Sequence, residues 1–528
     1  MLPPKSHKIL VTGKLHEVAI KALQALPNCT LTYRPDCKYD ELLTIVHDYR
    51  VLVTRSETRI DRELIDRAAK LKIIGRAAVG VANIDLDYAT ERGILVINCP
   101  AKNTNSAAEL AFALLLGVAR NVTAAALNVQ AGKWERHKFK GWELRGKSIG
   151  LVGIGNVGSR VCKFAHGFDM KVLGYDPYLS EDSFTKYEIN KYDDLLALAA
   201  DSDIMSLHVP LNKETTGMIN LPVLKALGNS GILLNTARGD VVNYADLLQV
   251  LEGGMLAGVV LDTWHNEPQP DPVIYQHRLV FGTPHIGAST EEAQVAIGIT
   301  IAEQVEKALA GDIVDYPVNV PHRIVITSER HRAQVVLAEK LGSLAGQLVS
   351  FHPNHIKFRH NSRVEEELNL LKVSWLKGFL QHIVDAYVSI VNCQQQLEKL
   401  GINISDEQAL MDKSTFEVVL ADHSNNQLCV GGVAFDAKTT RIVRIDEFDF
   451  EIKPHGCYLI IKNKDVPGVL GKLGTSLAQA NINIGSVYMS RIGGIAMAAI
   501  EVDEAISNTE KEKLLVTENL LSLHQIEL

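Results

Sequence analysis

The sequence predicts an α/β protein with two doubly wound parallel-sheet lobes, followed by an α+β unit and a ferredoxin-like unit. Residues 8–100 alternate short apolar runs, such as KILVT and LKIIG, with helical segments, which is the rhythm of βαβ units. A second alternating series starts at Lys147 and contains the runs SIGLVGIG, DIMSLHVP and AGVVLDT. Residues 456–528 follow the order β-α-β-β-α-β, which indicates a ferredoxin-like fold.

The remaining segments connect these units. Residues 105–132 are expected to form one long helical stretch. A helix from about Thr290 to Ala310 should follow the second series and pack back on the first lobe. Residues 325–405 look largely helical, and residues 415–452 look like antiparallel strands. The pattern changes near Pro321. The predicted domains are therefore residues 1–100 plus 291–320, residues 101–290, residues 321–453 and residues 454–528.

Composition narrows the function classes. The chain has 528 residues, 46% of them hydrophobic, and a net charge of -8; this charge argues against a general nucleic-acid binder, which usually carries a basic excess. Its seven cysteines are scattered and odd in number, so free thiols in a reducing compartment are expected. The longest apolar run, Ala111–Ala119, is too short to cross a membrane. We therefore expect a cytoplasmic protein with no nucleic-acid or membrane partner. No metal site is predicted.

A glycine motif predicts the cofactor site. Gly153, Gly155 and Gly158 form a GxGxxG between the strand SIGLV and an amphipathic helix, where such glycines permit a tight turn and close approach of a pyrophosphate. Asp176 ends the next strand, 18 residues after Gly158. Its carboxylate would bind the ribose hydroxyls and repel a 2′-phosphate. The motif therefore favours NAD over NADP.

Three polar residues follow later strands of the same predicted sheet. Arg238 follows GILLNTA, Glu267 follows AGVVLDT, and His285 follows RLVF; these strand ends converge on the ligand crevice of a doubly wound sheet. Histidine can exchange a proton near neutral pH, a neighbouring carboxylate stabilises the imidazolium, and arginine binds a substrate carboxylate. This set suits hydride transfer to or from a small 2-hydroxy acid, and we predict that these three residues are catalytic.

The segments GIGNVG, NTARGDVV, LDTWHNEP and PHIGAST, in this order, resemble the D-isomer-specific 2-hydroxyacid dehydrogenase family over about residues 8–320. The resemblance implies a flavodoxin-like substrate lobe and a Rossmann NAD lobe. Within the family, the chain is most similar to the long type, which oxidises 3-phosphoglycerate to phosphohydroxypyruvate in serine biosynthesis. That type has an intervening α+β domain and a C-terminal ferredoxin-like ACT domain.

The resemblance also implies roles for individual residues. Arg55 would lie near the substrate phosphate, and Gly80 and Val81, helped by Asn103, would bind the substrate carboxylate. The loop Gly132–Arg136 resembles one that reaches a neighbouring subunit, which implies a homodimer or homotetramer; its alternative is a solvated basic loop. The implied cofactor contacts, with Asp262 holding the nicotinamide amide, are Asn156, Val157, Asp176, His208, Thr236, Ala237 and Asp262.

The tail resembles an ACT domain at the segment NKDVPGVL, which starts at Asn463. The resemblance implies that Asn463, Asp465 and Asn483 bind an L-serine effector. Physically, polar groups at a strand end and a helix start can hold the ammonium and carboxylate of an amino acid. A dimerising module without a ligand is the alternative.

Two other functions remain open. One is a reductase of glyoxylate, hydroxypyruvate or another 2-keto acid. Arg55 and the Lys133–Arg136 loop instead favour a phosphorylated substrate. The other is an NAD-sensing corepressor or scaffold, which the catalytic set does not exclude but the ACT-like tail does not suit.

Overall fold

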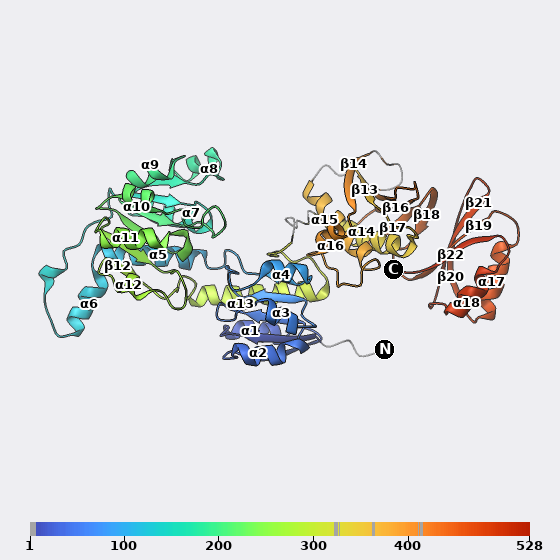
Figure 1. Ribbon diagram of the computed structural model, residues 1–528, viewed down its shortest axis with the longest axis horizontal. Helices are drawn as coiled ribbons and strands as arrows, with labels where there is room; N and C mark the ends of the chain where they lie inside the picture. Colours follow the sequence, from blue (N-terminus) through green and yellow to red (C-terminus); the bar gives the residue numbers. More distant parts are fainter. Residues whose placement is uncertain (1–6, 321–325, 327, 362–364, 410, 412–414) are drawn as a thin grey trace. The chain divides into compact units, whose positions relative to one another are not determined.

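The computed structural model describes residues 7–320, 326, 328–361, 365–409, 411 and 415–528. Figure 1 shows the helices and strands in the order of the sequence, and the chain divides into two compact units. One unit comprises Leu15–Ala22 and Cys99–Thr300, and the other comprises Met1–Lys14, Leu23–Asn98 and Ile301–Leu528. The change of pattern expected near Pro321 lies outside the described residues. The four domain boundaries stay a prediction.

The first sheet is parallel and has the order β2-β1-β3-β4-β5, which is the flavodoxin-like order. Every residue of β3 and β4 is buried, as expected for strands with helices on both faces. Its strands are β1 His7–Thr12, β2 Cys29–Arg34, β3 Val51–Thr54, β4 Ile73–Arg76 and β5 Leu95–Ile97. Its helices are α1 Glu17–Gln24, α2 Tyr39–Ile45, α3 Arg62–Arg67 and α4 Leu86–Glu91.

The second sheet is also parallel and has the order β12-β11-β10-β9-β6-β7-β8. The chain reverses its winding direction between neighbours β6 and β9, and ligands bind at such a switch point. The doubly wound fold class is thus confirmed. The strands are β6 Ser148–Val152, β7 Lys171–Tyr175, β8 Asn190–Lys191, β9 Ile204–Leu207, β10 Ile232–Asn235, β11 Gly258–Leu261 and β12 Val280–Gly282.

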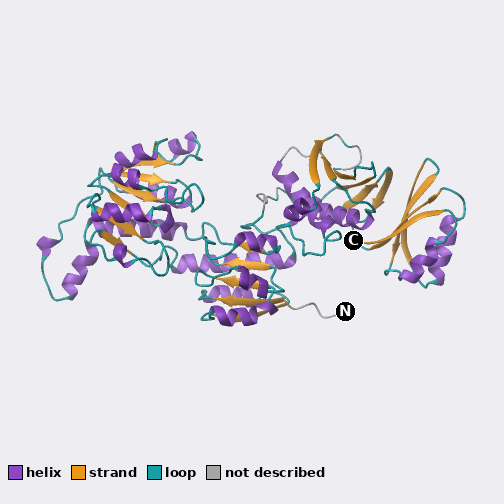
Figure 2. Cartoon of the chain, in the orientation of Figure 1, coloured by secondary structure: helices purple, strands orange, loops and turns teal. Residues whose placement is uncertain are grey.

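Helices lie on both sides of this sheet (Figure 2). They bury its apolar strands in two clusters, one on each face, with Ile149 and Leu233 as fully buried examples. The helices are α7 Asn156–Gly167, α8 Glu181–Lys186, α9 Leu195–Ala200, α10 Leu221–Leu227, α11 Tyr244–Glu252 and α12 Pro272–Tyr275, and α13 Glu291–Ala310 follows the sheet.

The single helical stretch expected over residues 105–132 is wrong. The structure has two helices, α5 Thr104–Ala119 and α6 Val122–Gln130, bent by 66°. Asn121 breaks the stretch because it adopts a left-handed conformation with φ 53°, which ends a right-handed helix. Among the described residues, α5 and α6 reach the length and apolarity of a membrane span only when taken together, and no single helix does.

The α+β unit after the two lobes packs helices on one sheet of order β14-β13-β15-β16-β17-β18. Two strands, β13 and β14, lie within or next to the region expected to be largely helical. β13 (HIKFRH) has only two apolar residues, and β14 (NISDEQ) is almost wholly polar, so neither segment is the apolar run by which the other strands were predicted. The strands are β13 His355–His360, β14 Asn403–Gln408, β15 Phe416–Ala421, β16 Gln427–Ala434, β17 Thr440–Ile445 and β18 Phe448–Ile452.

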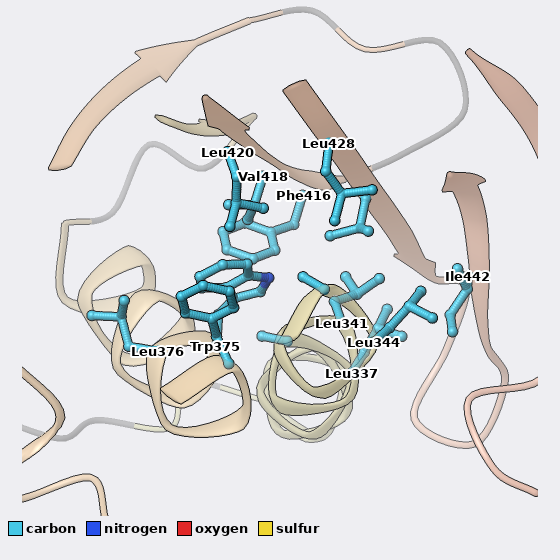
Figure 3. Close-up of a cluster of buried hydrophobic side chains, with 14 of the residues drawn as sticks. Leu337, Leu341, Leu344, Trp375, Leu376, Phe416, Val418, Leu420, Leu428 and Ile442 are labelled. Carbon is cyan, nitrogen blue, oxygen red and sulfur yellow. The ribbon is translucent and has the colours of Figure 1, made fainter. Parts of the chain in front are cut away.

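The helices of this unit are α14 Glu329–Leu348, α15 Glu365–Leu380 and α16 Cys393–Lys399. Trp375 of α15 is fully buried and points toward Phe416 and Val418 of the sheet (Figure 3). Its ring stacks on Phe379 at 5.0 Å and meets Phe358 edge to face at 5.5 Å. Aromatic pairs in these geometries stabilise a core beyond the area they bury.

The last sheet is antiparallel with the order β20-β21-β19-β22, which confirms the ferredoxin-like expectation. Alternate residues of β19 pack into two different clusters of buried hydrophobic side chains. Leu459 and Ile461 join a cluster with α17 and α18, whereas Tyr458 and Ile460 belong to the same cluster as Trp375. The elements are β19 Cys457–Lys464, α17 Val469–Gln479, β20 Ile484–Ile492, β21 Ile495–Val502, α18 Asn508–Leu515 and β22 Leu520–Glu527.

Candidate active site

The glycine turn after β6 leaves room for a phosphate group. Gly153 has φ +89°, and a Cβ at Gly158 would lie 2.1 Å from the Gly153 carbonyl oxygen, so a side chain at Gly158 would separate the helix from the turn. A Cβ at Gly155 would meet no atom of the described chain within 4 Å. Gly155 precedes α7 directly. The turn and the helix start therefore form an open backbone cradle that fits the pyrophosphate of NAD.

Asp176 is held beside this turn. Its Oδ2 accepts a hydrogen bond from the Ile154 amide at 2.9 Å, and its Oδ1 accepts one from the Tyr178 amide at 3.1 Å. The carboxylate is thus fixed at the end of β7, next to the phosphate cradle. This is the position in which an acidic residue binds ribose hydroxyls.

Other predicted cofactor contacts line the ends of β9 and β10. His208 bonds Ser206 Oγ through Nε2 at 2.8 Å, and burial lowers the pKa of His208 to about 4, so this imidazole is neutral near pH 7. Thr236 presents a buried hydroxyl that has no partner in the described part of the chain. An unpaired buried hydroxyl is costly, so Thr236 fits a site that receives a polar ligand.

The structure brings Glu267 and His285 into direct contact. Glu267 Oε2 lies 2.6 Å from His285 Nδ1, and Glu267 Oε1 accepts a hydrogen bond from the Trp264 amide at 2.7 Å. Burial raises the pKa of Glu267, but the hydrogen bonds from His285 and Trp264 and the charges of His285 and Arg238 outweigh it and hold this pKa below its ordinary value. Glu267 is therefore ionised and orients His285 through Nδ1, which leaves Nε2 for proton transfer.

Arg238 lies after β10 and is half-buried. Its Nη1 donates to the Ala237 carbonyl at 2.6 Å. Burial lowers the pKa of Arg238, and the charge of Glu267 opposes that shift. An arginine stays protonated under such a shift, so Arg238 supplies a partly desolvated cation in the same region as Glu267.

Asp262 is hydrogen-bonded to the loop that contains His285, which the sequence did not suggest. Its Oδ1 accepts from the Thr283 hydroxyl at 2.6 Å and from the Ile286 amide at 2.8 Å, and its Oδ2 accepts from the Gly287 amide at 2.9 Å. Asp262 is 1% exposed. It therefore holds the loop in which His285 adopts a left-handed φ of 55°. Its role toward the nicotinamide amide stays a prediction.

The predicted substrate residues are divided between the units. Arg55, Gly80 and Val81 belong to one unit, and Asn103 belongs to the unit of the catalytic set. Arg55 donates to the Lys14 carbonyl at 2.8 Å. Asn83, which the sequence did not single out, donates to the Arg55 carbonyl at 3.1 Å and so ties the Arg55 loop to the turn that contains Gly80 and Val81.

The predicted effector residues do not meet within one chain. Asn463 and Asp465 lie at the carboxyl end of β19, where Asn463 pairs with Ala496. Asn483 precedes Ile484, which pairs with Val502 at the other end of β21, and its side chain donates to Asp503 at 2.9 Å. Asn483 is therefore at the opposite end of the sheet from Asn463.

Comparison with known proteins agrees with this architecture. Residues 112–287 match the model of the D-isomer specific 2-hydroxyacid dehydrogenase NAD-binding domain, and residues 331–446 match the D-3-phosphoglycerate dehydrogenase intervening domain. The solved D-lactate dehydrogenase of Aquifex aeolicus, in complex with NAD and lactic acid, is 28% identical with a TM-score of 0.51, over 58% of this chain and 96% of that chain.

Curated relatives extend the match to nearly the whole chain. D-3-phosphoglycerate dehydrogenase of Methanocaldococcus jannaschii is 34% identical over 525 residues, which are 99% of this chain and 100% of the relative. The enzyme of the same name from Mycobacterium tuberculosis is 35% identical over 489 residues, or 91% of each chain. The glycine turn, the histidine–glutamate pair and the added intervening domain thus have a common explanation, and the chain belongs to the D-3-phosphoglycerate dehydrogenase family.

Proposed function

We propose that this protein oxidises 3-phosphoglycerate to 3-phosphohydroxypyruvate with NAD, the first step of serine biosynthesis. The single observation that supports this most is the contact of Glu267 with His285 Nδ1 at 2.6 Å, on strand ends of an NAD-binding sheet that also positions Arg238. Relatives that match this chain over almost its full length have this activity in their names.

The residues suit this oxidation. Arg238 binds the substrate carboxylate and orients C2. The C2 hydroxyl gives its proton to Nε2 of His285, while Glu267 stabilises the resulting imidazolium from Nδ1. NAD, when bound, accepts the hydride that leaves C2, so the alcohol becomes a ketone and the charges balance. In the reverse direction the imidazolium returns the proton to the carbonyl oxygen.

The phosphorylated substrate is favoured by groups outside the catalytic set. Arg55 supplies a cation for the phosphate, and Gly80, Val81 and Asn103 supply polar groups for the carboxylate. These assignments follow from the sequence resemblance. The hydrogen bond from the Asn83 side chain to the Arg55 carbonyl supports these assignments, because it fixes the loop that contains Arg55 relative to the turn that contains Gly80.

Self-association is supported by an exposed apolar arm. Every residue of α6 is at least partly exposed, and Val122, Leu127 and Val129 are more than half exposed, while Trp134 is 81% exposed. Figure 1 shows α6 extending away from the sheet of its own unit. Exposed apolar side chains gathered on one arm indicate a protein interface, and we expect a homodimer or homotetramer that uses this arm, including the Gly132–Arg136 loop.

Regulation by L-serine needs a second copy if all three predicted effector residues take part. β20 is an edge strand, and antiparallel pairing of two such edges places the beginning of one strand beside the end of the other. Asn483 of one copy would then approach Asn463 and Asp465 of the other. A purely dimerising module is the alternative.

The seven free cysteines support a reducing, cytoplasmic location.

The test compares substrates in both directions. NADH oxidation is measured with phosphohydroxypyruvate, hydroxypyruvate and glyoxylate, and NAD reduction with 3-phosphoglycerate. We expect the highest kcat/KM for phosphohydroxypyruvate. A preference for a non-phosphorylated acid would replace the proposal by a general 2-keto-acid reductase, and turnover of none of them would favour a corepressor or scaffold.

A further inference from the structure

Trp264 contacts all three loops that contain the catalytic residues. Its indole Nε1–H donates to the Thr283 carbonyl at 2.8 Å, in the loop of His285. Its own amide donates to Glu267 Oε1 at 2.7 Å. A Cβ at Gly239 would lie 2.1 Å from the Trp264 carbonyl carbon, so the turn after Arg238 packs directly on the Trp264 backbone.

The indole ring also fills a space that is closed on the strand side. A Cβ at Gly282, the last residue of β12, would lie 2.3 Å from Trp264 Cζ2. The ring is packed against the cluster that contains Leu261 and Val259. Trp264 is therefore held at two points. Its ring packs on β12, where Gly282 leaves room for it, and its backbone packs on the turn after Arg238, where Gly239 leaves room for it.

We propose that Trp264 is a positioning residue that sets the distances among Arg238, Glu267 and His285. This inference rests on the proposed dehydrogenase function and deepens it. Trp264 is given no part in the proton transfer itself. It links the end of β11 to the loops after β10 and β12, so a change at Trp264 should displace these loops relative to one another.

The expected effect follows from the geometry of the catalytic pair. Loss of the indole hydrogen bond frees the Thr283 carbonyl and loosens the loop of His285, while Glu267 stays on the Trp264 turn. The distance from Glu267 Oε2 to His285 Nδ1 then varies, and misplacement by about 1 Å can lower turnover by up to about 100-fold. The titratable and charged groups around the turn are Arg238, Glu267, Asp262 and Asp240, which is in contact with His265.

The test replaces Trp264 by phenylalanine in the full-length protein. Trp264→Phe keeps an aromatic ring and removes only the N–H donor and one ring. We expect kcat to fall by about 5- to 20-fold, with the Kd for NAD within about twofold of the wild type, because the glycine cradle and Asp176 are untouched. Trp264→Tyr, which also lacks the indole N–H, is the second variant in case phenylalanine packs poorly.

The pH profile separates positioning from simple packing. Proton transfer from the C2 hydroxyl to His285 gives kcat a pH dependence, and a looser contact between His285 and Glu267 should change the pH profile of kcat in Trp264→Phe. A packing defect alone would lower the unfolding midpoint and leave the pH profile of kcat unchanged.

Trp142→Phe is the matched control, because Trp142 packs against the other face of the sheet. We expect it to keep both kcat and the pH profile. The proposal is overturned if Trp264→Phe retains wild-type kcat, or if its pH profile is the same as that of Trp142→Phe. A wild-type protein without dehydrogenase turnover would instead overturn the proposed function, so the two failures are distinguishable.

Discussion

Replacing Asp262 by asparagine should both destabilise the NAD-binding lobe and reduce turnover. The Asp262 carboxylate accepts three hydrogen bonds of 2.6, 2.8 and 2.9 Å from the loop around His285 and is 1% exposed. Asparagine can keep its oxygen on Thr283 and Ile286, but its NH2 group then faces the Gly287 amide. Two donors face each other, and a buried amide is left without an acceptor.

The magnitude follows from these contacts. A buried unsatisfied donor costs about 1–3 kcal/mol, and the two remaining bonds lose the benefit of a charged acceptor. The total is about 2–4 kcal/mol, which for a lobe of this size corresponds to a fall of about 5–15 °C in the unfolding midpoint. Because the same loop places His285 at its left-handed φ, kcat should fall by about tenfold or more.

Calorimetry of the full-length protein measures the first effect. The transition of the NAD-binding lobe is identified as the one that added NAD shifts upward. Asp271→Asn is the matched control: Asp271 caps α12 by accepting from the Val273 amide, and asparagine caps helices about equally well. If Asp262→Asn lowers the midpoint no more than Asp271→Asn does and keeps wild-type kcat, the structural role assigned to Asp262 is refuted.

Further predictions concern the catalytic pair, the cofactor and the effector. His285→Ala should lower kcat by about 100-fold or more, and near-normal turnover would contradict its role. The pKa of Glu267 is held below its ordinary value of 4.5, so its stabilising contribution is present above its unfolded pKa and is lost as pH falls through the lower folded value. Glu267→Gln should remove this contribution to the acid-side loss of stability, measured by calorimetry below pH 4.5. Asp176→Ala should raise the Kd for NAD and narrow its preference over NADP by about tenfold or more, measured by fluorescence titration. Asp465→Ala should relieve serine inhibition without altering NAD binding, and unchanged inhibition would argue against that site.

The sheets could be predicted because their signal is local. Buried parallel strands such as β3 and β9 are continuous apolar runs, and the GxGxxG identifies which sheet binds the dinucleotide. The errors occur where a single residue or the tertiary contacts decide. Asn121 ends a helix that apolar composition alone would continue. β13 alternates basic residues with buried Ile356 and Phe358, and its strand identity depends on pairing with β15, far along the chain.

The candidate site shows the same division at the level of side chains. Arg238, Glu267 and His285 could be proposed from the sequence because proton transfer and carboxylate binding restrict the residue types, and because strand ends converge at one edge of the sheet. Asp262 and Trp264 bond to the His285 loop, 21 and 19 positions away, and neither bond requires a residue type that a motif would reveal. A tryptophan after a strand is usually part of a core. The close approach of Gly239 and Gly282 to Trp264 supports the proposal that Trp264 positions the predicted catalytic residues. Substitutions at these glycines should therefore impair turnover even though neither glycine can take part in the chemistry.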